Sequence, residues 1–270
     1  SGYYLHLLSL SEGKSIFPGV PVHLDEKIKG RLCEVEGVFC SFLDVMFKVP
    51  GFLWISQPPL FGEIGWIVEG RIVNPDSYRI LERIMLLYSS GIIQSLLCKP
   101  SVRVLEIGAG FGGLAYHLSK IIRNLRYVVV DVPESLIFSS IYLSVTQSGL
   151  SNENIGPGQE VLFHNGESGF SFVPNFLFDN VVRSNEKFDL VINTLSMSEM
   201  SEAQVRYYCS GIKELLGNYG VFFEQNQNNK HLQDGLNAQE IIAEYFPRQE
   251  VLSSGYFQRL SQGFAHLWRL

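Results

Sequence analysis

The sequence predicts an α/β fold, with a mostly parallel β-sheet and α-helices on both of its faces. From residue 102 onward, short apolar segments alternate with longer segments in which apolar residues recur at the helical period. A glycine-rich turn joins the first of these apolar segments to the helix that follows it. Alternation of strands and helices indicates a parallel sheet, because each helix crosses over the sheet and returns the chain to the same edge.

Seven strands and four helices are expected in this part of the chain. The strands are Val102–Ile107, Tyr127–Val130, Glu160–Phe163, Phe188–Asn193, Gly220–Glu224, Val251–Ser253 and Ala265–Arg269. The helices are Gly112–Ile122, Pro133–Gln147, Ser201–Leu216 and Asn237–Tyr245. Only residues 254–264 separate the last two strands, which is too short for a crossover helix. We therefore expect these two strands to pair antiparallel at the edge of the sheet.

Residues 1–98 lack this alternation. Gly and Pro divide the segment into short pieces, and aromatic residues are frequent between them. One helix is expected to begin at the N-cap Asn74 and to end at Gly91, and a second is expected over Ile92–Cys98. The chain is therefore predicted to have two parts, a mainly helical or irregular cap over 1–98 and an α/β domain over 99–270. The aromatic residues of the cap could cover a substrate or bury a homodimer interface.

Composition and charge exclude several classes of function. Apolar residues make up 46% of the 270 residues, which is enough for a sizeable core. The net charge of −6 argues against a nucleic-acid partner, because such proteins neutralise phosphates with basic side chains. The four cysteines match no zinc or redox spacing. No segment has the roughly 20 apolar residues that span a bilayer, and no secretory signal is recognised, so we expect no membrane span and a cytoplasmic location.

The strongest functional signal is the glycine-rich turn, which reads LEIGAGFGG over Leu105–Gly113. It lies directly between a predicted strand and a predicted helix, the context in which such a turn binds a nucleotide cofactor. Glycines permit a tight turn and a close approach of backbone to ligand. The first turn of the helix then offers free N–H groups and the positive end of its dipole.

Two cofactors are compatible with this turn. Gly108, Gly110 and Gly113 satisfy the dinucleotide pattern GxGxxG, whereas Glu106 with Gly108, Gly110 and Gly112 satisfies the S-adenosylmethionine pattern ExGxGxG. Glu106 favours the second pattern, because this position is mostly apolar in dinucleotide folds. In methyltransferases the acid lies near the ammonium end of the cofactor. The position of the turn, about 100 residues into the chain, and the closing pair of strands also favour a methyltransferase.

Two further polar positions follow predicted strands. Asp131 ends the second strand, where a carboxylate can accept hydrogen bonds from both ribose hydroxyls, or can instead serve as a helix N-cap. Asn165 follows the third strand and could pair with the edge of adenine, although an ordinary polar loop is equally compatible. The predicted cofactor-binding residues are Glu106, Gly108, Ala109, Gly110, Gly112, Asp131, Val132, Asn165 and Asn193.

Three segments of the domain together resemble the sugar O-methyltransferase family, within the class I S-adenosylmethionine-dependent methyltransferases. They are Glu106–Gly113, the stretch DVPE from Asp131, and the stretch NTLSMSEM from Asn193. The stretch FGEIGW from Phe61, leading to NPD at Asn74, is similar to the same family, so the resemblance covers roughly residues 54–227. It implies a Rossmann-like, seven-stranded methyltransferase sheet over 99–270 with an antiparallel last strand. It also implies S-adenosyl-L-methionine as cofactor, with a sugar or glycosylated small molecule as acceptor.

A sugar hydroxyl is a poor nucleophile while protonated, so a general base or a metal ion is expected beside it. The acceptor must lie beyond the carboxyl ends of the strands, which makes Glu199, Glu224 and His231 the candidate catalytic residues. For each of them a solvated loop residue or a helix-cap partner is the plainer interpretation. No carboxylate pair has clear Mg²⁺ spacing, which leaves a divalent metal undecided.

Two other functions are compatible with the same residues. One is an NAD-dependent oxidoreductase, and the other is a non-catalytic partner protein that binds the cofactor. Fold alone does not separate these from a methyltransferase.

Overall fold

The computed structural model describes residues 49–58, 66–68, 71–147, 149–157, 168–232, 235–252 and 265–270. The chain divides into two units, Ser1–Leu81 and Glu82–Leu270. The predicted division into a cap over 1–98 and a cofactor-binding domain over 99–270 concerns the roles of the two segments, and it remains a prediction.

The described part of the first unit is small. It contains the 3₁₀ helix η1 (Gly51–Leu53) and a two-stranded antiparallel sheet of β1 (Trp66–Val68) and β2 (Arg71–Val73). The guanidinium carbon of Arg71 lies 4.3 Å from the centroid of the Trp54 ring, a cation–π contact. Helix α3 (Pro75–Ser89) begins in this unit. The side chain of Asn74 accepts a hydrogen bond from the Ser77 N–H at 2.8 Å, which confirms the predicted N-cap.

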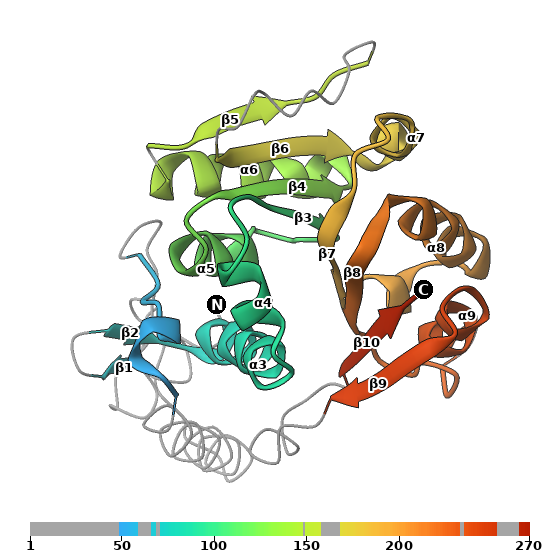
Figure 1. Cartoon of the computed structure of the whole chain (residues 1–270), viewed down its shortest axis with the longest axis horizontal. Helices are drawn as coiled ribbons and strands as arrows, with labels where there is room; N and C mark the ends of the chain where they lie inside the picture. Colours follow the sequence, from blue (N-terminus) through green and yellow to red (C-terminus); the bar gives the residue numbers. More distant parts are fainter. Residues whose placement is uncertain are drawn as a thin grey trace, which may run out of the picture. The chain divides into compact units, whose positions relative to one another are not determined.

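Among the described residues of the second unit, eight strands form one sheet in the order β5-β6-β4-β3-β7-β8-β10-β9 (Figure 1). Six neighbouring strands, from β5 to β8, run parallel, and β10 lies antiparallel between β8 and β9. The strands are β3 (Val102–Ile107), β4 (Leu125–Asp131), β5 (Ser151–Asn154), β6 (Gly169–Pro174), β7 (Phe188–Thr194), β8 (Leu216–Gln225), β9 (Arg248–Leu252) and β10 (Ala265–Arg269).

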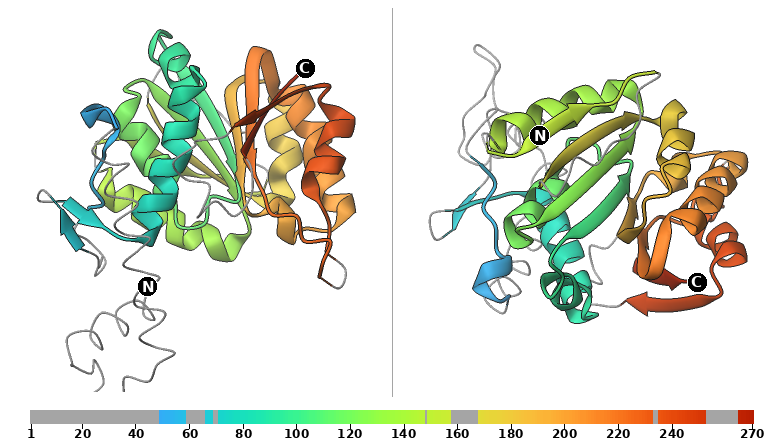
Figure 2. Two further views of the ribbon diagram at one scale, coloured as in Figure 1. Left: turned by 90° about the horizontal axis from the view of Figure 1, so that it is seen from below. Right: turned by 45° about the horizontal axis from the view of Figure 1, so that its top comes forward.

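Helices cover both faces of this sheet (Figure 2). They are α4 (Ile92–Leu97), α5 (Gly113–Ile121), α6 (Pro133–Thr146), α7 (Phe178–Arg183), α8 (Glu202–Leu215) and α9 (Ala238–Tyr245), with the 3₁₀ turns η2 (Asn175–Leu177) and η3 (Met197–Glu199). Side chains on one face of β3, β4, β7, β8 and β10 form a single hydrophobic cluster with α7, α8 and α9. Because side chains alternate along a strand, the residues between them face the side where α6 packs on β4 and β6 and contacts α5.

The predicted fold class is confirmed, including the antiparallel pairing of the last two strands. The described sheet has eight strands rather than the predicted seven. The predicted strand Glu160–Phe163 lies outside the described residues, and the strand beside β4 is β6, with β5 beyond it. The segment SNEN of β5 contains no apolar residue, so periodicity does not identify this strand. In β6, Phe170 and Phe172 do alternate with Gly and Ser, but this signal extends over only a few residues and the sequence analysis did not use it.

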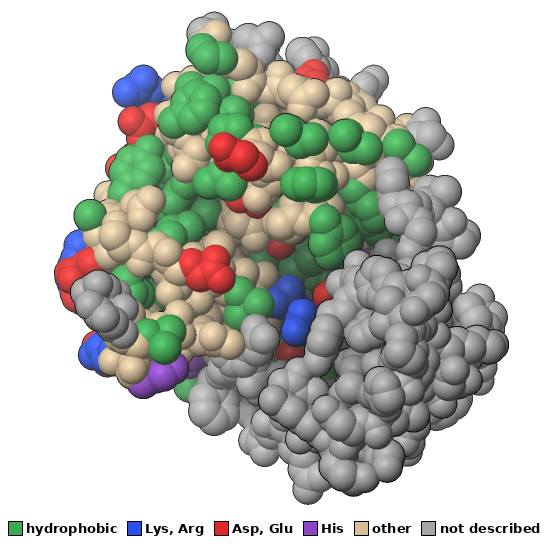
Figure 3. Space-filling view, turned by 180° about the vertical axis from the view of Figure 1, so that it is seen from behind, with side chains coloured by type: hydrophobic (Ala, Val, Ile, Leu, Met, Phe, Trp, Pro, Cys, Tyr) green, Lys and Arg blue, Asp and Glu red, His purple; other side chains and the backbone are tan. Residues whose placement is uncertain are grey.

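Basic side chains of the described residues do not form a continuous patch on the face seen in Figure 3. Hydrophobic side chains are exposed over the upper part of that face instead. Helix α6 contributes outward-facing apolar residues, with 58% of Ile137, 67% of Phe138 and 52% of Ile141 exposed.

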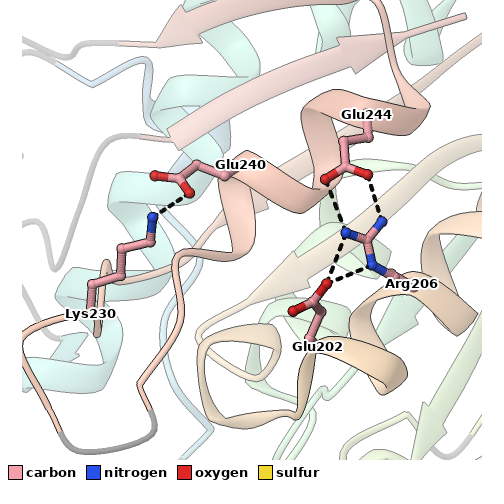
Figure 4. A network of polar contacts seen from close by, with 5 residues as sticks. All are labelled: Glu202, Arg206, Lys230, Glu240 and Glu244. Carbon is pink, nitrogen blue, oxygen red and sulfur yellow. Dashed lines mark hydrogen bonds and ion pairs between the residues drawn. The ribbon is translucent and has the colours of Figure 1, made fainter.

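An arginine links α8 to α9 (Figure 4). Arg206 forms two hydrogen bonds to the carboxylate of Glu244, at 2.6 and 3.0 Å, and one to Glu202 on its own helix at 2.9 Å. The hydrogen bond to Glu244 is the main cause that raises the pKa of Arg206, and the hydrogen bond to Glu202 acts in the same direction. Lys230 forms a further ion pair with Glu240 of α9. The two-point geometry makes this contact directional, although exposed pairs of this kind add little stability.

The packing of α8 on α7 requires a glycine at position 211. A Cβ atom there would lie 2.4 Å from the ring of Phe178, which is fully buried and has little room to move. We therefore expect Gly211→Ala to lower the free energy of unfolding by about 1–3 kcal/mol in chemical denaturation. Ser210→Ala, on the exposed face of the same helix, is the control and should leave it nearly unchanged. Equal stability of the two variants would contradict this packing constraint.

Candidate functional site

A cavity of about 440 Å³ lies at the carboxyl ends of β3, β4, β6 and β7. Its volume falls within the usual range for sites that bind one small molecule. Strand β3 pairs with β4 on one side and with β7 on the other, so the order in which strands are added to the sheet reverses at β3. Doubly wound folds bind ligands at such a switch point. The lining residues are Ile107, Gly108, Gly110, Val130, Asp131, Val132, Ser135, Asn175, Thr194, Leu195, Ser196, Glu199, Met200, Gln204 and Tyr208.

The glycine-rich turn after β3 forms one wall of the cavity. Gly108, Gly110 and Gly112 have φ of 78°, 58° and 88°, in the left-handed region that favours glycine. A Cβ on Gly108 would lie 2.2 Å from Ser196 Oγ, so this glycine lets the loop after β7 approach the turn. A Cβ on Gly110 would meet no atom within 4 Å, so the turn is open to a ligand there. The carbonyl of Ala109 accepts a hydrogen bond from the Gly112 N–H and closes the turn.

Asp131 ends β4 and lies against the glycine turn. Its carboxylate accepts hydrogen bonds from the Gly110 N–H at 3.0 Å and from the Val132 N–H at 2.8 Å. Burial raises the pKa of Asp131, and these backbone hydrogen bonds oppose that effect. Asp131 does not cap α6, whose N-cap residue is Val132 and which has no side-chain cap. The carboxylate lines the cavity, as a group that binds ribose hydroxyls must.

A polar side chain lies at the end of β6. Asn175 directly follows this strand and lines the cavity. Sequence reasoning chose Asn165 for this place because it expected the third strand at Glu160–Phe163, and both lie outside the described residues. The local signal for the alternative was the pair Pro174 and Asn175, which ends a strand and begins a turn. Two residues of α8, Gln204 and Tyr208, line the cavity and were also missed.

Asn193 is the last residue but one of β7, and it is not among the residues that line the cavity. Its side chain is fully buried, and its amide nitrogen donates to the Ile107 carbonyl at 2.8 Å and to Ser196 Oγ at 2.5 Å. Asn193 thus joins the end of β3 to the loop that follows β7. Its predicted direct contact with a cofactor remains a prediction.

Glu106 lies on β3 with only 2% of its surface exposed, and it does not line the described cavity. The Tyr127 hydroxyl donates a hydrogen bond to its carboxylate at 2.7 Å. Burial raises the pKa of Glu106 to about 7, although the Tyr127 hydrogen bond and the charge of Arg83 oppose the change. That Glu106 lies near the ammonium group of a bound cofactor remains a prediction.

The three candidate catalytic residues lie in different surroundings. Glu199 is exposed and lines the cavity. Glu224 is fully buried and accepts hydrogen bonds from three side chains, one of them His266 Nδ1 at 2.6 Å. His231 is exposed, with its Nδ1 3.2 Å from the Asn228 carbonyl oxygen, and is not among the lining residues. Only Glu199 of the three therefore faces the cavity.

In the described ranges, no three His, Cys, Asp or Glu side chains come together as a metal site would require. None of the helices in these ranges combines the length and apolar character needed to cross a bilayer.

The chain matches no protein-family model and no curated protein. Solved structures resemble it at low sequence identity. CurJ carbon methyltransferase is 15% identical over 69% of this chain and 54% of its own, with a TM-score of 0.48. A candidate O-methyltransferase from Nostoc punctiforme PCC 73102 is 14% identical over 70% and 57%, with a TM-score of 0.45. Precorrin-6y C5,15-methyltransferase from Geobacter metallireducens GS-15 is 14% identical over 66% and 85%, with a TM-score of 0.43. This chain thus spans little more than half the length of the first two.

The raised pKa of Glu106 predicts a pH-dependent stability. Between the pKa of an unfolded glutamate, about 4.3, and the folded value of about 7, the folded state binds the additional proton. Stability contributed by this group is therefore full below about pH 4 and is lost as the pH rises through 7. The variant Glu106→Gln carries no ionisable group here and still accepts a hydrogen bond from Tyr127. We therefore expect the free energy of unfolding of the parent protein, measured relative to this variant, to fall by about 3 kcal/mol from pH 5 to pH 8. Urea denaturation at both pH values measures the difference.

Glu134→Gln is the control for this comparison, because Glu134 is exposed in the first turn of α6. Its free energy of unfolding should follow the parent protein at both pH values. A Glu106→Gln variant that also follows the parent protein would show that Glu106 ionises at its ordinary pKa.

Proposed function

We propose that this chain is an S-adenosylmethionine-dependent methyltransferase whose acceptor is a hydroxyl of a sugar or glycosylated small molecule. The observation that carries the proposal is the cavity at the switch point of the sheet. There the open side of Gly110 and the carboxylate of Asp131 face the same space. This is the chemistry that a nucleoside with a free ribose requires.

The residues of the cavity fit the nucleoside part of this cofactor. The space beside Gly110 has room for a ligand where any side chain would project. The carboxylate of Asp131 can accept from two adjacent ribose hydroxyls, and the amide of Asn175 offers both a donor and an acceptor to a purine edge. When bound, S-adenosylmethionine supplies a methyl group on a sulfonium sulfur. An in-line nucleophile takes the methyl group, and the sulfur leaves as the thioether of S-adenosylhomocysteine.

The order of strands favours this cofactor over NAD. A dinucleotide fold continues its second half with parallel strands in the order 4-5-6. Here the antiparallel strand β10 lies between β8 and β9, the arrangement expected of a methyltransferase sheet. An NAD-dependent oxidoreductase is the alternative function, and a binding measurement with NADH tests it.

Glu199 is the candidate general base for the acceptor hydroxyl. It is an acid on η3, and it lines the same cavity as the glycine turn. A carboxylate beside the acceptor would remove the hydroxyl proton while the oxygen attacks the methyl carbon. The proposed acceptor platform is the aromatic-rich segment 1–98.

A methyl group added at Gly110 tests the cavity. The Cβ of Gly110→Ala would occupy space that the ligand needs. We therefore expect S-adenosylhomocysteine to bind at least about tenfold more weakly in isothermal titration. Gly91→Ala is a matched control. Gly91 has a φ of 79°, and a Cβ added there would meet no atom within 4 Å, but it lies at the start of α4 rather than in the cavity. The two variants carry a similar backbone strain of about 1–2 kcal/mol.

Equal loss of affinity in both glycine variants would mean that strain, rather than occupied space, weakens binding, and would remove the cavity from the proposal. A parent protein that binds NADH and not S-adenosylhomocysteine would overturn the methyltransferase assignment.

The carboxylate of Asp131 gives a second, independent test. We expect Asp131→Ala to weaken S-adenosylhomocysteine binding at least tenfold, or by about 1.4 kcal/mol, because two charge-assisted hydrogen bonds to the ribose are lost. Glu134→Ala removes an exposed acid three residues further along the chain, and its affinity should match the parent protein. Thermal unfolding of both variants shows whether a folding defect contributes. Unchanged affinity in a folded Asp131→Ala protein would contradict the ribose role.

A further inference from the structure

Glu224 is the centre of a buried group of polar side chains near the carboxyl end of β8. One carboxylate oxygen lies 2.6 Å from His266 Nδ1, and the other accepts from Asn226 Nδ2 at 2.9 Å and Gln239 Nε2 at 3.2 Å. His266 lies directly opposite Glu224 in the antiparallel pairing of β10 with β8. Glu224 has no exposed surface, so it meets no acceptor directly.

The carboxylate determines which way the Asn226 amide is turned. Both oxygens of an ionised carboxylate only accept hydrogen bonds, so the NH₂ group of Asn226 must face Glu224. The amide oxygen of Asn226 then points to the Ser198 N–H, which donates to it at 3.1 Å. A flipped amide would place two acceptors together at Glu224 and two donors together at Ser198, which is costly for buried groups.

The same orientation passes to Asn193. The NH₂ group of Asn226 also donates to Asn193 Oδ1 at 2.9 Å, and the Met197 N–H donates to that oxygen at 3.2 Å. The NH₂ group of Asn193 is therefore turned to the Ile107 carbonyl and to Ser196. The two successive amides therefore share one orientation, because each amide has one donating and one accepting end. Glu224 fixes this orientation at one end of the relay, together with the Ser198 and Met197 N–H groups and the Ile107 carbonyl.

The relay ends on two walls of the cavity. Ile107 immediately precedes the glycine turn, and residues 195–200 form the loop after β7. This loop begins with Leu195 in the left-handed region at a φ of 68°, a conformation that the surroundings of a branched residue must hold in place. Leu195, Ser196, Glu199 and Met200 of the loop line the cavity.

We propose that Glu224, held by His266, is a positioning residue that fixes the loop 195–200 against the glycine turn through Asn226 and Asn193. Glu224 thereby acts on the site without touching a ligand, in place of the catalytic role expected from sequence. The inference rests on the proposed function only for the identity of the ligand, because the relay and the loop are properties of the chain alone.

The test compares Glu224→Leu with Glu224→Gln by hydrogen exchange of the ligand-free protein. Leu accepts no hydrogen bond, so one N–H of the buried Asn226 amide loses its partner and the relay is weakened at its first step. Exchange in the peptide covering 194–200 should then become about tenfold faster or more. Gln restores the relay, because its carbonyl accepts from Asn226 and Gln239 while its NH₂ group faces His266 Nδ1, which accepts in the other tautomer. Exchange in this variant should stay within about threefold of the parent protein.

Asn226→Ala is a milder second variant if Glu224→Leu does not fold. It interrupts the relay but leaves Glu224 with His266 and Gln239, and it should accelerate the same exchange. Glu250→Leu is the control, because it removes a strand carboxylate that pairs with Arg269 at the exposed edge strand β9. Exchange in 194–200 should not change in that variant.

Titration with S-adenosylhomocysteine then separates the two proposals. Affinity that falls about tenfold in Glu224→Leu and in a folded Asn226→Ala protein, and returns in Glu224→Gln, supports the relay, because only Gln keeps an acceptor for the Asn226 amide. Unchanged exchange in Asn226→Ala, or equal acceleration in the Leu and Gln variants, would overturn it. Faster exchange in a protein whose parent binds no S-adenosylhomocysteine supports the relay and counts against the proposed function alone.

Discussion

The close contact between the turn after β3 and the loop after β7 is the interaction on which the cavity depends. The Ile107 carbonyl accepts hydrogen bonds from Asn193 and Ser196, and a Cβ on Gly108 would lie 2.2 Å from Ser196 Oγ. Parallel strands place their carboxyl ends at one edge, but they leave the connecting segments free to diverge. Here the missing side chain of one glycine and the amide of one asparagine bring the two connections together. The space that remains beside Gly110 and Asp131 is the cavity.

Two buried glutamates on the same sheet show how differently a carboxylate can be accommodated. Glu106 receives a hydrogen bond from the Tyr127 hydroxyl, and burial raises its pKa to about 7. Glu224 receives hydrogen bonds from Asn226, which directly follows β8, from Gln239 on α9 and from His266 on β10. An acceptor with several donors around it can orient the neighbouring amides. The two residues therefore lie on one sheet but have different consequences for the site.

The reversed strand β10 connects topology with the site. Because β10 lies antiparallel beside β8, its residue His266 is brought opposite Glu224, although more than 40 positions separate them in the chain. A parallel strand at this place would enter the carboxyl edge from the other direction and would present different residues there. The fold thus supplies a partner for a buried acid in addition to covering the edge of the parallel strands.

The sequence by itself determined the α/β alternation, the glycine turn and Asp131, because each depends on a local pattern: hydrophobic period, positive φ and the residue that ends a strand. It did not predict β5 and β6, because SNEN has no apolar residue and the alternation in GFSFVP extends over only a few residues. It also could not distinguish Glu199, Glu224 and His231, all of which follow or end strands. Tertiary structure alone decided that Glu199 faces the cavity and Glu224 is buried, because burial and hydrogen-bond partners come from β10 and α9, which are distant in the chain.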